Sequence, residues 1–372
     1  MITDWSESNS PDPLKYSLDR GREMIARGWM SVCAGMLLVA CLMGSQSKPV
    51  SPESNGERWL ADFRNDDGSI PDGQNPSRDD SSALQKALDA GPGVVRIGSG
   101  NFQIHDVSIS SNVELIGSGP ATVLQARERQ PVFKQQGQSG WRLRDLSLKG
   151  SASGDWQKRT DQGAHGLVID GSWDYEVSGL TIEDFDGAGI QIGHTNNQAA
   201  GYAAGGVLTR ITSRENHVGV RFDTRAEYIT ASHLHCHHNV TGMIVHAGNS
   251  NISNSNIGEN IDGLVIIDHE NGSHGSVTGC LINHNQRYAL WANEVRNGMA
   301  ITNCCFFYGT IKLEKSCGVT ISSGLISASI STEGEDFNRI SGNHIIPLEW
   351  QFAVSPSTIC DGNYTKSGPW KP

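Results

Sequence analysis

Val177-Ser-Gly-Leu-Thr-Ile182 is the first of six short runs that repeat one pattern of apolar, small and polar residues. The other five are Ile229-Thr-Ala-Ser-His-Leu234, Ile252-Ser-Asn-Ser-Asn-Ile257, Val277-Thr-Gly-Cys-Leu-Ile282, Ile301-Thr-Asn-Cys-Cys-Phe306 and Ile340-Ser-Gly-Asn-His-Ile345. A second set of apolar runs lies between them: Gly189–Ile192, Gly219–Phe222, Gly242–Val245, Gly263–Ile266, Ala289–Trp291 and Thr310–Leu313. The loose period of about 20–25 residues is typical of solenoid proteins.

Stacking explains how such short runs become stable. A strand with few apolar residues buries little surface alone, but parallel strands stacked at about 4.8 Å pair their whole backbone and share one core. Gly and Asn fall at the ends of the runs, where Gly tolerates positive φ and stacked Asn side chains can hydrogen-bond. The intervals are too short for the helices of a βαβ fold, and a β-sandwich is the remaining alternative. The sequence therefore predicts an all-β fold, a right-handed parallel β-helix.

One helix is expected before the solenoid. Asp79-Asp-Ser-Ser-Ala-Leu-Gln-Lys-Ala-Leu-Asp-Ala90 begins with Asp and Ser, carries Leu84 and Leu88 one turn apart, and ends before Gly91-Pro92. The terminal rung of a solenoid would otherwise expose its core. We expect this short helix to cap the N-terminal end.

The segment 79–126 resembles the opening of the pectate-lyase-like β-helix superfamily. After the acidic pair Asp79-Asp80 it carries Ala83-Leu-Gln-Lys-Ala87, Gly93-Val-Val-Arg-Ile-Gly-Ser-Gly-Asn-Phe-Gln-Ile104 and Ser111-Asn-Val-Glu-Leu-Ile-Gly117. The resemblance implies a single parallel β-helix domain over residues 79–372. It also implies a link to polysaccharides, since the superfamily includes lyases, polygalacturonases, epimerases and tailspikes.

No subfamily signature accompanies this resemblance. The chain lacks the NTD, GHG and RIK runs of polygalacturonases, the DPHD run of mannuronan epimerases and the Arg-Pro motif of pectate lyases. Because enzymes and non-catalytic surface proteins share the fold, membership does not fix a function.

The N-terminal residues are expected to serve export. The apolar run from Gly28 to Ala40 is too short for an ordinary membrane span and suits a signal peptide. Leu38-Val-Ala-Cys41 resembles a bacterial lipobox, which implies lipidation of Cys41; an ordinary signal peptide is the alternative. We interpret residues 1–41 as an export segment and the Ser-, Pro- and Gly-rich residues 42–78 as a flexible tether. The protein is then either secreted or held in the cell envelope by its lipid.

Composition narrows the partners. Of 372 residues 43 are Gly and only 19% are charged, which fits strands and turns rather than a helical bundle. The formal net charge of −11 argues against nucleic acid. A local basic groove could still bind an acidic polysaccharide. We expect a polysaccharide partner, no nucleic acid, and membrane contact only through the lipid; the oligomeric state stays open, a trimer included.

One column of outward-facing residues is rich in proton-transfer groups. It follows the first strand of successive rungs and comprises Glu183, Asp184, Asp186, Arg214, Glu215, His217, His235, His237, His238, Glu259, Asp262, His284 and Arg287. The insertion 151–166 leaves the solenoid on the same side, and long loops on compact scaffolds are often functional. These residues could instead be the solvated corners of a solenoid.

Six members of this column are our catalytic candidates: Arg214, Glu215, His235, His237, His238 and Glu259. In elimination or C5 epimerisation of a uronate, Arg214 or a bound Ca²⁺ would neutralise the carboxylate while His235 or His238 takes the C5 proton. In hydrolysis, Glu215 and Glu259 would stand two rungs, about 10 Å, apart, which suits inversion.

Six further residues are substrate-binding candidates: Trp156, Lys158, Arg159, His165, Arg221 and Asp223. Trp156 could stack on a sugar, and the two basic residues beside it could pair with a uronate. A second column comprises His194, Arg221, Asp223, His246, Asp268, His269 and Glu294. Arg221 and Asp223 are two apart on one strand, so both should face outward and could pair with each other.

We predict no metal ligands from the sequence. No CxxC pair is present, and three open-sided histidines at 235, 237 and 238 without a nearby Cys are weak support for a metal site. We interpret the cysteines that follow Cys41 as buried free thiols, namely Cys236, Cys280, Cys304, Cys305, Cys317 and Cys360. A disulfide from Cys280 to Cys304 or Cys305 remains an alternative.

These observations favour a polysaccharide lyase or glycosidase acting on an extracellular polysaccharide, for which a uronate-containing chain is one candidate. The clustered His, Arg and carboxylate groups beside the Trp156 loop support an enzyme. The missing family signatures favour the alternative, a non-catalytic glycan-binding or tailspike-like surface protein.

Overall fold

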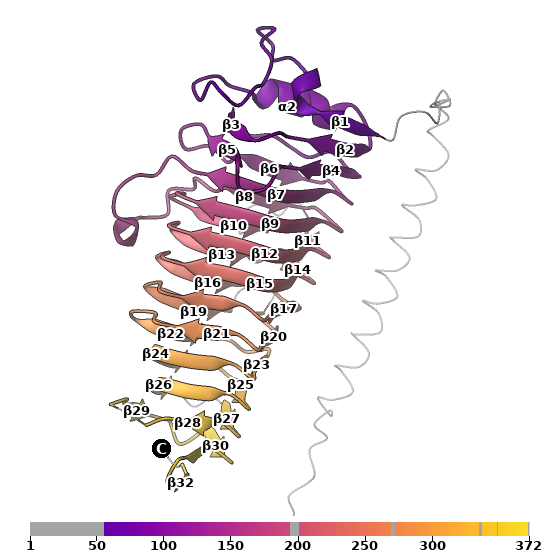
Figure 1. Ribbon diagram of the computed structural model, residues 1–372. Coiled ribbons are helices and arrows are strands. Elements are labelled where there is room, and N and C mark those ends of the chain that lie inside the picture. Colours follow the sequence, from indigo (N-terminus) through magenta and orange to yellow (C-terminus); the bar gives the residue numbers. More distant parts are fainter. Residues whose placement is uncertain (1–55, 194–200, 269–271, 335–336, 348, 371) are drawn as a thin grey trace, which may run out of the picture. The chain divides into compact units, whose positions relative to one another are not determined.

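The computed structural model describes residues 56–193, 201–268, 272–334, 337–347, 349–370 and 372. The predictions for residues 1–55, including lipidation of Cys41, lie outside this part. The described strands stack into a right-handed parallel β-helix of about 11 turns (Figure 1), which confirms the predicted fold. None of the described helices has the length and apolar character needed to cross a bilayer.

Parallel pairing arranges the strands on three faces. Face 1 comprises β1 (Glu57–Trp59), β2 (Gly93–Arg96), β4 (Val113–Ile116), β17 (Ser250–Ser253), β20 (Gly275–Thr278), β23 (Met299–Thr302), β25 (Val319–Ser322), β27 (Arg339–Ser341), β30 (Ile359–Asp361) and the first halves of β7 (Arg142–Lys149), β9 (Glu176–Glu183), β12 (Val207–Arg214) and β15 (Thr230–His237). Face 2 comprises the second halves of β7, β9, β12 and β15, the first halves of β24 (Cys305–Glu314) and β26 (Leu325–Glu333), and β3 (Gly100–Ile104), β5 (Thr122–Ala126), β18 (Asn256–Gly258), β21 (Leu281–Asn283), β28 (His344–Ile345) and β31 (Tyr364–Thr365). Face 3 comprises β6 (Phe133–Gln136), β8 (Leu167–Asp170), β10 (Ala188–Ile192), β13 (Val218–Phe222), β16 (Thr241–Val245), β19 (Asp262–Ile267), β22 (Tyr288–Asn293), β29 (Phe352–Ala353) and the second halves of β24 and β26.

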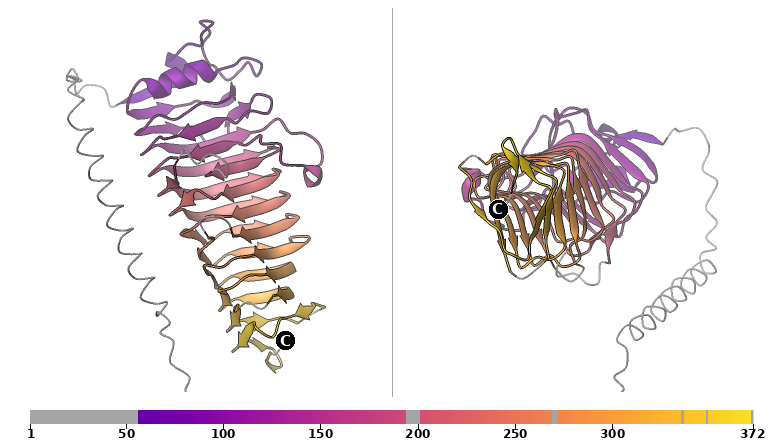
Figure 2. Two further views of the ribbon diagram at one scale, coloured as in Figure 1. Left: turned by 180° about the vertical axis from the view of Figure 1, so that it is seen from behind. Right: turned by 90° about the horizontal axis from the view of Figure 1, so that it is seen from below.

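Small pairings complete the sheet structure. A separate two-stranded parallel ribbon joins β11 (Ala203–Ala204) to β14 (Ala226–Glu227), and β32 (Gly368–Pro369) turns back antiparallel on β31. Seen from below in Figure 2, the strands of successive rungs lie over one another. Inward side chains such as Ile182, Cys236 and Ile257 are fully buried, so one continuous apolar core runs along the axis.

Left-handed residues make the corners between faces. At the first corner, between faces 1 and 2, Gly179 and Asn254 have φ of 65° and 48°. At the second corner, between faces 2 and 3, six successive rungs carry a residue with positive φ: Asp184, Glu215, His238, Glu259, His284 and Tyr308. Since this conformation costs residues other than Gly about 1–2 kcal/mol, the second corner carries local strain.

An asparagine ladder lies just inside the second corner. The backbone N–H of Asn216 donates to Oδ1 of Asn239 at 2.9 Å, that of Asn239 to Asn260 at 2.9 Å, and that of Asn260 to Asn285 at 3.1 Å. All four side chains are buried. Their stacking satisfies backbone donors that the turn would leave unpaired, as expected from the sequence.

The N-terminal cap forms where the helix was predicted. Helix α2 (Ser81–Asp89) lies at the N-terminal end of the stack (Figure 1). It turns Leu84 and Leu88 toward the core, where both are fully buried, and an apolar face of this kind stabilises the first rung.

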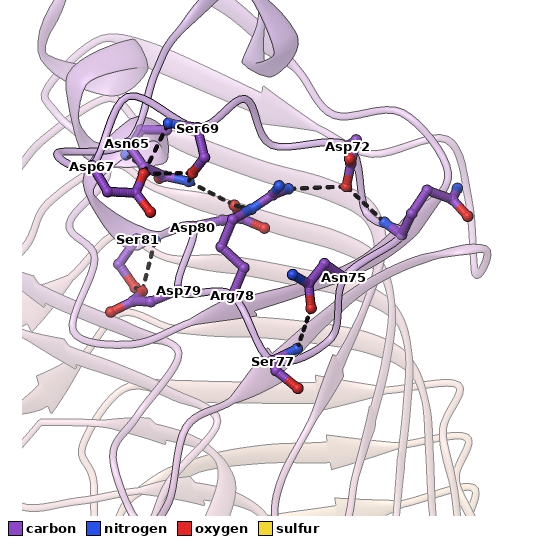
Figure 3. Close-up of polar contacts among 12 residues, drawn as sticks. Asn65, Asp67, Ser69, Asp72, Asn75, Ser77, Arg78, Asp79, Asp80 and Ser81 are labelled. Atoms are coloured by element: carbon purple, nitrogen blue, oxygen red, sulfur yellow. Dashed lines mark hydrogen bonds and ion pairs between the residues drawn. The ribbon is translucent and has the colours of Figure 1, made fainter.

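The predicted tether of 42–78 is wrong for residues 56–78, which fold onto the cap. Strand β1 pairs in parallel with β2, and the 3₁₀-helix η1 (Leu60–Asp62) buries Leu60. The polar loop beyond is held by side chains (Figure 3): Asp80 accepts from Asn65 Nδ2 at 2.9 Å and from Arg78 Nε at 2.8 Å. Hydrogen bonding, not flexibility, explains the polar composition of this segment.

The cysteines of the described part are free thiols. Cys280 and Cys304 stand on successive rungs, and the N–H of Cys280 lies 3.5 Å from Sγ of Cys304. Both are buried, so they serve as small core residues.

Candidate functional site

Charged side chains line up along the outer surface of face 2. The register places Lys149, Glu183, Arg214 and His237 side by side on four consecutive rungs. Glu183 accepts from Arg214 Nη2 at 2.6 Å and lies 3.4 Å from Lys149 Nζ. Arg214 therefore already has a carboxylate partner, although 43% of its side chain remains exposed.

Three groups meet at the second corner to form what we call the histidine cluster, namely His237, His238 and Glu259. Successive residues of a strand point to opposite faces, but the left-handed φ of 56° at His238 turns its ring to the same side as that of His237. Their Nδ1 atoms are 2.8 Å apart, and His238 Nδ1 lies 3.5 Å from Oε2 of Glu259 on the next rung. The rung alignment made from the sequence placed these three residues together.

His235 extends the cluster along face 2. Its ring centroid lies 4.3 Å from that of His237, and both rings line a cleft of about 260 Å³ with Glu259, Asn256, Gly258 and Asn283. Burial, together with the neighbouring rings of His235 and His238, lowers the pKa of His237 to about 4. The His237 imidazole is therefore neutral near pH 7.

The insertion 151–166, which we call the loop, docks against this column. Arg159 is buried and pairs with Asp184 at 2.9 Å, and its backbone carbonyl contacts His217 Nδ1 at 3.0 Å. The 3₁₀-helix η2 (Trp156–Lys158) places the Trp156 ring edge-on to His238, with centroids 5.6 Å apart. The loop thus adds an aromatic wall to the histidine cluster.

Two loop residues take roles other than those predicted. Lys158 is exposed and pairs with Asp155 at 3.5 Å within the loop. Arg159 uses its guanidinium on Asp184, so it anchors the loop and cannot meet a uronate there. Of Trp156, Lys158 and Arg159, it is Trp156 that faces the histidine cluster.

A second cavity, of about 420 Å³, is lined by residues of face 3 and by the C-terminal end of the loop. His165 is the predicted residue that lines it. Three of its polar lining residues were not predicted, namely Lys134, Asp170 and Gln191. Asp170 is the last residue of β8, and Asp223 directly follows β13, so the two aspartates hold equivalent positions on face 3. An alignment of the runs extended upstream of Gly189 would therefore have identified Asp170.

The predicted pairing of Arg221 with Asp223 is wrong. Arg221 reaches the loop and pairs with Asp161 at 2.8 Å, whereas Asp223 is buried and contacts His246 at 3.4 Å. Partners from the insertion and from the next rung replace the partner on the same strand. Of the remaining members of the second column, His194 and His269 lie outside the described residues.

Asp223 provides a pH-dependent contact. Burial raises its pKa, but hydrogen bonds from His246 and the Thr224 N–H outweigh burial and leave the pKa below its usual range. A carboxylate with a lowered pKa stabilises the fold above its unfolded pKa of about 3.9, and that contribution is lost as the pH falls through the folded pKa. We therefore expect Asp223→Asn to lower the free energy of unfolding at pH 7, with a deficit that shrinks below about pH 4. Urea unfolding of the wild type and the variant at pH 7 and below about pH 4 checks this. A difference in the free energy of unfolding that grows in acid would contradict the prediction.

The two glutamates proposed for hydrolysis stand as the sequence predicted, two rungs apart with His238 between them. His238 stands on the rung between the two glutamates, and its Nδ1 lies 3.5 Å from Oε2 of Glu259. An inverting glycosidase holds its water between its two carboxylates. The arrangement therefore suits hydrolysis less well than proton abstraction by a histidine.

No protein-family model and no curated protein matches the sequence. Solved structures do resemble the chain. The A-module of mannuronan C-5 epimerase AlgE6 from Azotobacter vinelandii has a TM-score of 0.59 at 15% identity, over 84% of this chain and 100% of that one. The catalytic unit of an alpha-1,3-glucanase from Streptomyces thermodiastaticus has a TM-score of 0.62 at 15% identity, over 88% and 72%. A double mutant of the tailspike protein of E. coli bacteriophage HK620 has a TM-score of 0.62 at 13% identity, over 88% and 69%.

At such low identity the likeness concerns the fold alone. It agrees with the parallel register and the three faces described above. The chain is a right-handed parallel β-helix protein, with a fold similar to those of the epimerase, the glucanase and the tailspike.

Proposed function

We propose that this protein is an exported polysaccharide lyase that acts on a uronate-containing polysaccharide bound over the cleft beside the histidine cluster. The observation that carries the proposal is the convergence of an aromatic wall, Trp156, with His235 and Arg214 on one stretch of the second corner and face 2. Sugar-binding sites combine apolar ring surfaces with a few placed polar groups. A glycan lying along the rungs would meet these groups in succession.

The similar structures support a glycan as partner. One is named for the C-5 epimerisation of mannuronan, one for the hydrolysis of an alpha-1,3-glucan, and the HK620 tailspike has been solved with a pentasaccharide. The export segment predicted for residues 1–41, with Cys41 as lipid acceptor, would bring the protein to polysaccharides outside the cytoplasm.

Elimination needs a base and a positive charge at the uronate carboxylate. In the proposed step the imidazole of His235 accepts the C5 proton, and the electron pair of the C5–H bond forms the C4–C5 double bond. The C4–O4 bond breaks, the departing oxygen takes a proton from water, and the resulting hydroxide takes the proton from the His235 imidazolium, which restores the base. Arg214 is paired with Glu183 and stands beside His237 on the neighbouring rung. Its guanidinium would face the uronate carboxylate.

Product analysis tests the proposal. The purified protein is incubated with pectate, alginate, chondroitin and neutral glycans, and the ultraviolet absorbance of the conjugated double bond is followed. We expect new absorbance with a uronate-containing glycan. New reducing ends without that absorbance would show hydrolysis instead, and binding without any cleavage would show a non-catalytic binder; either result overturns the proposal.

A histidine pair gives the matched test of the site. His235→Ala should lower kcat by at least about 100-fold, because a positioned general base contributes that much. His233→Ala should leave kcat unchanged, because His233 is an exposed residue of the first corner, away from the cleft. Equal activity of the two variants would remove His235 from the mechanism.

A further inference from the structure

The histidine cluster has the donor set of a metal site, because Glu259 joins two of the three histidines considered from the sequence. One ring nitrogen of His237, one ring nitrogen of His238 and a carboxylate oxygen of Glu259 all lie within 4.8 Å of one another. The two measured contacts, 2.8 Å between the nitrogens and 3.5 Å from His238 to Glu259, bracket the roughly 3.3 Å that separates ligand atoms around a tetrahedral zinc ion with bonds of about 2.0 Å. Small side-chain movements would admit the ion.

We infer that His237, His238 and Glu259 bind one divalent transition-metal ion of the zinc type. Two imidazole nitrogens and one carboxylate form the His₂Glu set of open zinc sites, which leaves a fourth position for water or substrate. Ca²⁺ prefers six to eight oxygen ligands, so this donor set fits it poorly. The Ca²⁺ considered from the sequence is therefore not the ion that this cluster would select.

The local backbone holds the ligands in place. Both His238 and Glu259 occupy left-handed positions of the second corner, with φ of 56° and 59°, and the N–H of His238 donates to the carbonyl of Glu259 at 3.2 Å. Corner geometry and rung stacking thus bring two consecutive histidines and a residue 21 positions later to one point. Glu183 balances the nearby charge of Arg214 at 2.6 Å, which reduces its repulsion of a cation.

The open position would face the cleft. His237 and Glu259 also line that cleft, so a bound ion would present positive charge to an anionic ligand there. In this respect the inference deepens the proposed lyase function, in which the uronate carboxylate needs a cation. Metal binding itself requires no glycan and can be tested alone.

Titration of the chelator-treated protein with Zn²⁺ in a calorimeter tests the site. We expect one ion per chain, and at least about 100-fold weaker binding in His238→Ala and in Glu259→Gln, since even the loss of an outer-sphere partner costs 10–100-fold. His233→Ala and Glu294→Gln serve as matched controls and should bind as the wild type does. Wild-type affinity in both cluster variants would overturn the inference.

Co²⁺ serves as a spectroscopic probe of the ligands. Bound to the cluster it should give the visible bands of nitrogen and oxygen ligation, without sulfur-to-cobalt charge transfer. Strong charge transfer would assign the ion to the partly exposed thiols Cys305, Cys317 and Cys360 and would overturn the inference. If the protein binds Zn²⁺ but is inactive on glycans, the metal site is supported and the lyase function is overturned. If the protein is active but does not bind Zn²⁺, the lyase function is supported and the metal site is overturned.

Discussion

Replacing Asn239 with Leu should lower the free energy of unfolding by about 4 kcal/mol, because it leaves two buried groups unpaired at about 1–3 kcal/mol each and breaks the ladder. The Asn239 side chain accepts from the N–H of Asn216 at 2.9 Å and donates to the carbonyl of Ser213 at 3.0 Å. It is fully buried, so water cannot replace these partners. Leu has a similar volume, which separates the polar loss from a packing loss.

Asn251→Leu provides the control for this measurement. Asn251 is exposed on face 1, and its side chain accepts one hydrogen bond from Ser276 at 2.9 Å. Surface changes of this kind stay within about 0.5 kcal/mol. Urea unfolding of the two variants should therefore differ clearly, and equal midpoints would show that the ladder contributes little to stability.

Asp184→Gly should release the loop without unfolding the solenoid. The guanidinium of Arg159 is buried, and Asp184 is its hydrogen-bond partner in the described part of the chain. Removing one member of a buried ion pair costs about 3–5 kcal/mol. Amide exchange of Ala152 and Gln162, which donate to the carbonyls of Asp184 and Asp186, should accelerate by more than about 100-fold.

Glycine is the informative replacement because Asp184 has φ of 66°, and Gly tolerates this conformation. Glu215→Gly, at the next rung of the same corner, removes a carboxylate in the same backbone setting and should leave loop exchange unchanged. Adding Arg159→Met to Asp184→Gly should slow the exchange again, since no unpaired charge remains. Equal exchange in the two glycine variants would show that the ion pair does not hold the loop.

The sequence was sufficient for the solenoid, the capping helix and the asparagine ladder, because each depends on local pattern. It did not separate faces 1 and 2, since a run such as Ile229–Leu234 hides its corner at His233, whose φ is 55°. A β-branched run interrupted by one left-handed residue looks continuous in sequence. Polar residues 56–78 looked like a tether because hydrogen bonds to Asp80 leave no apolar pattern.

The spatial placement of the candidate residues followed from the sequence where it depended on the rungs. Aligning the runs brought His237, His238 and Glu259 together, since register alone decides which residues stack. It failed where the insertion supplied a partner, as Asp161 does for Arg221. The path of a long loop depends on tertiary contacts, such as the burial of Arg159, that no periodic pattern encodes.

The second corner also bears on protein engineering. At six successive rungs of this corner the left-handed conformation is adopted by a residue that is neither Gly nor Asn, and most of these residues are Glu or His. Replacing such a residue with Gly would relieve the backbone strain. A thermostabilisation programme would therefore select substitutions along the very edge that holds the proposed ligands. Resistance to heat and chemical competence would then trade against each other at single positions.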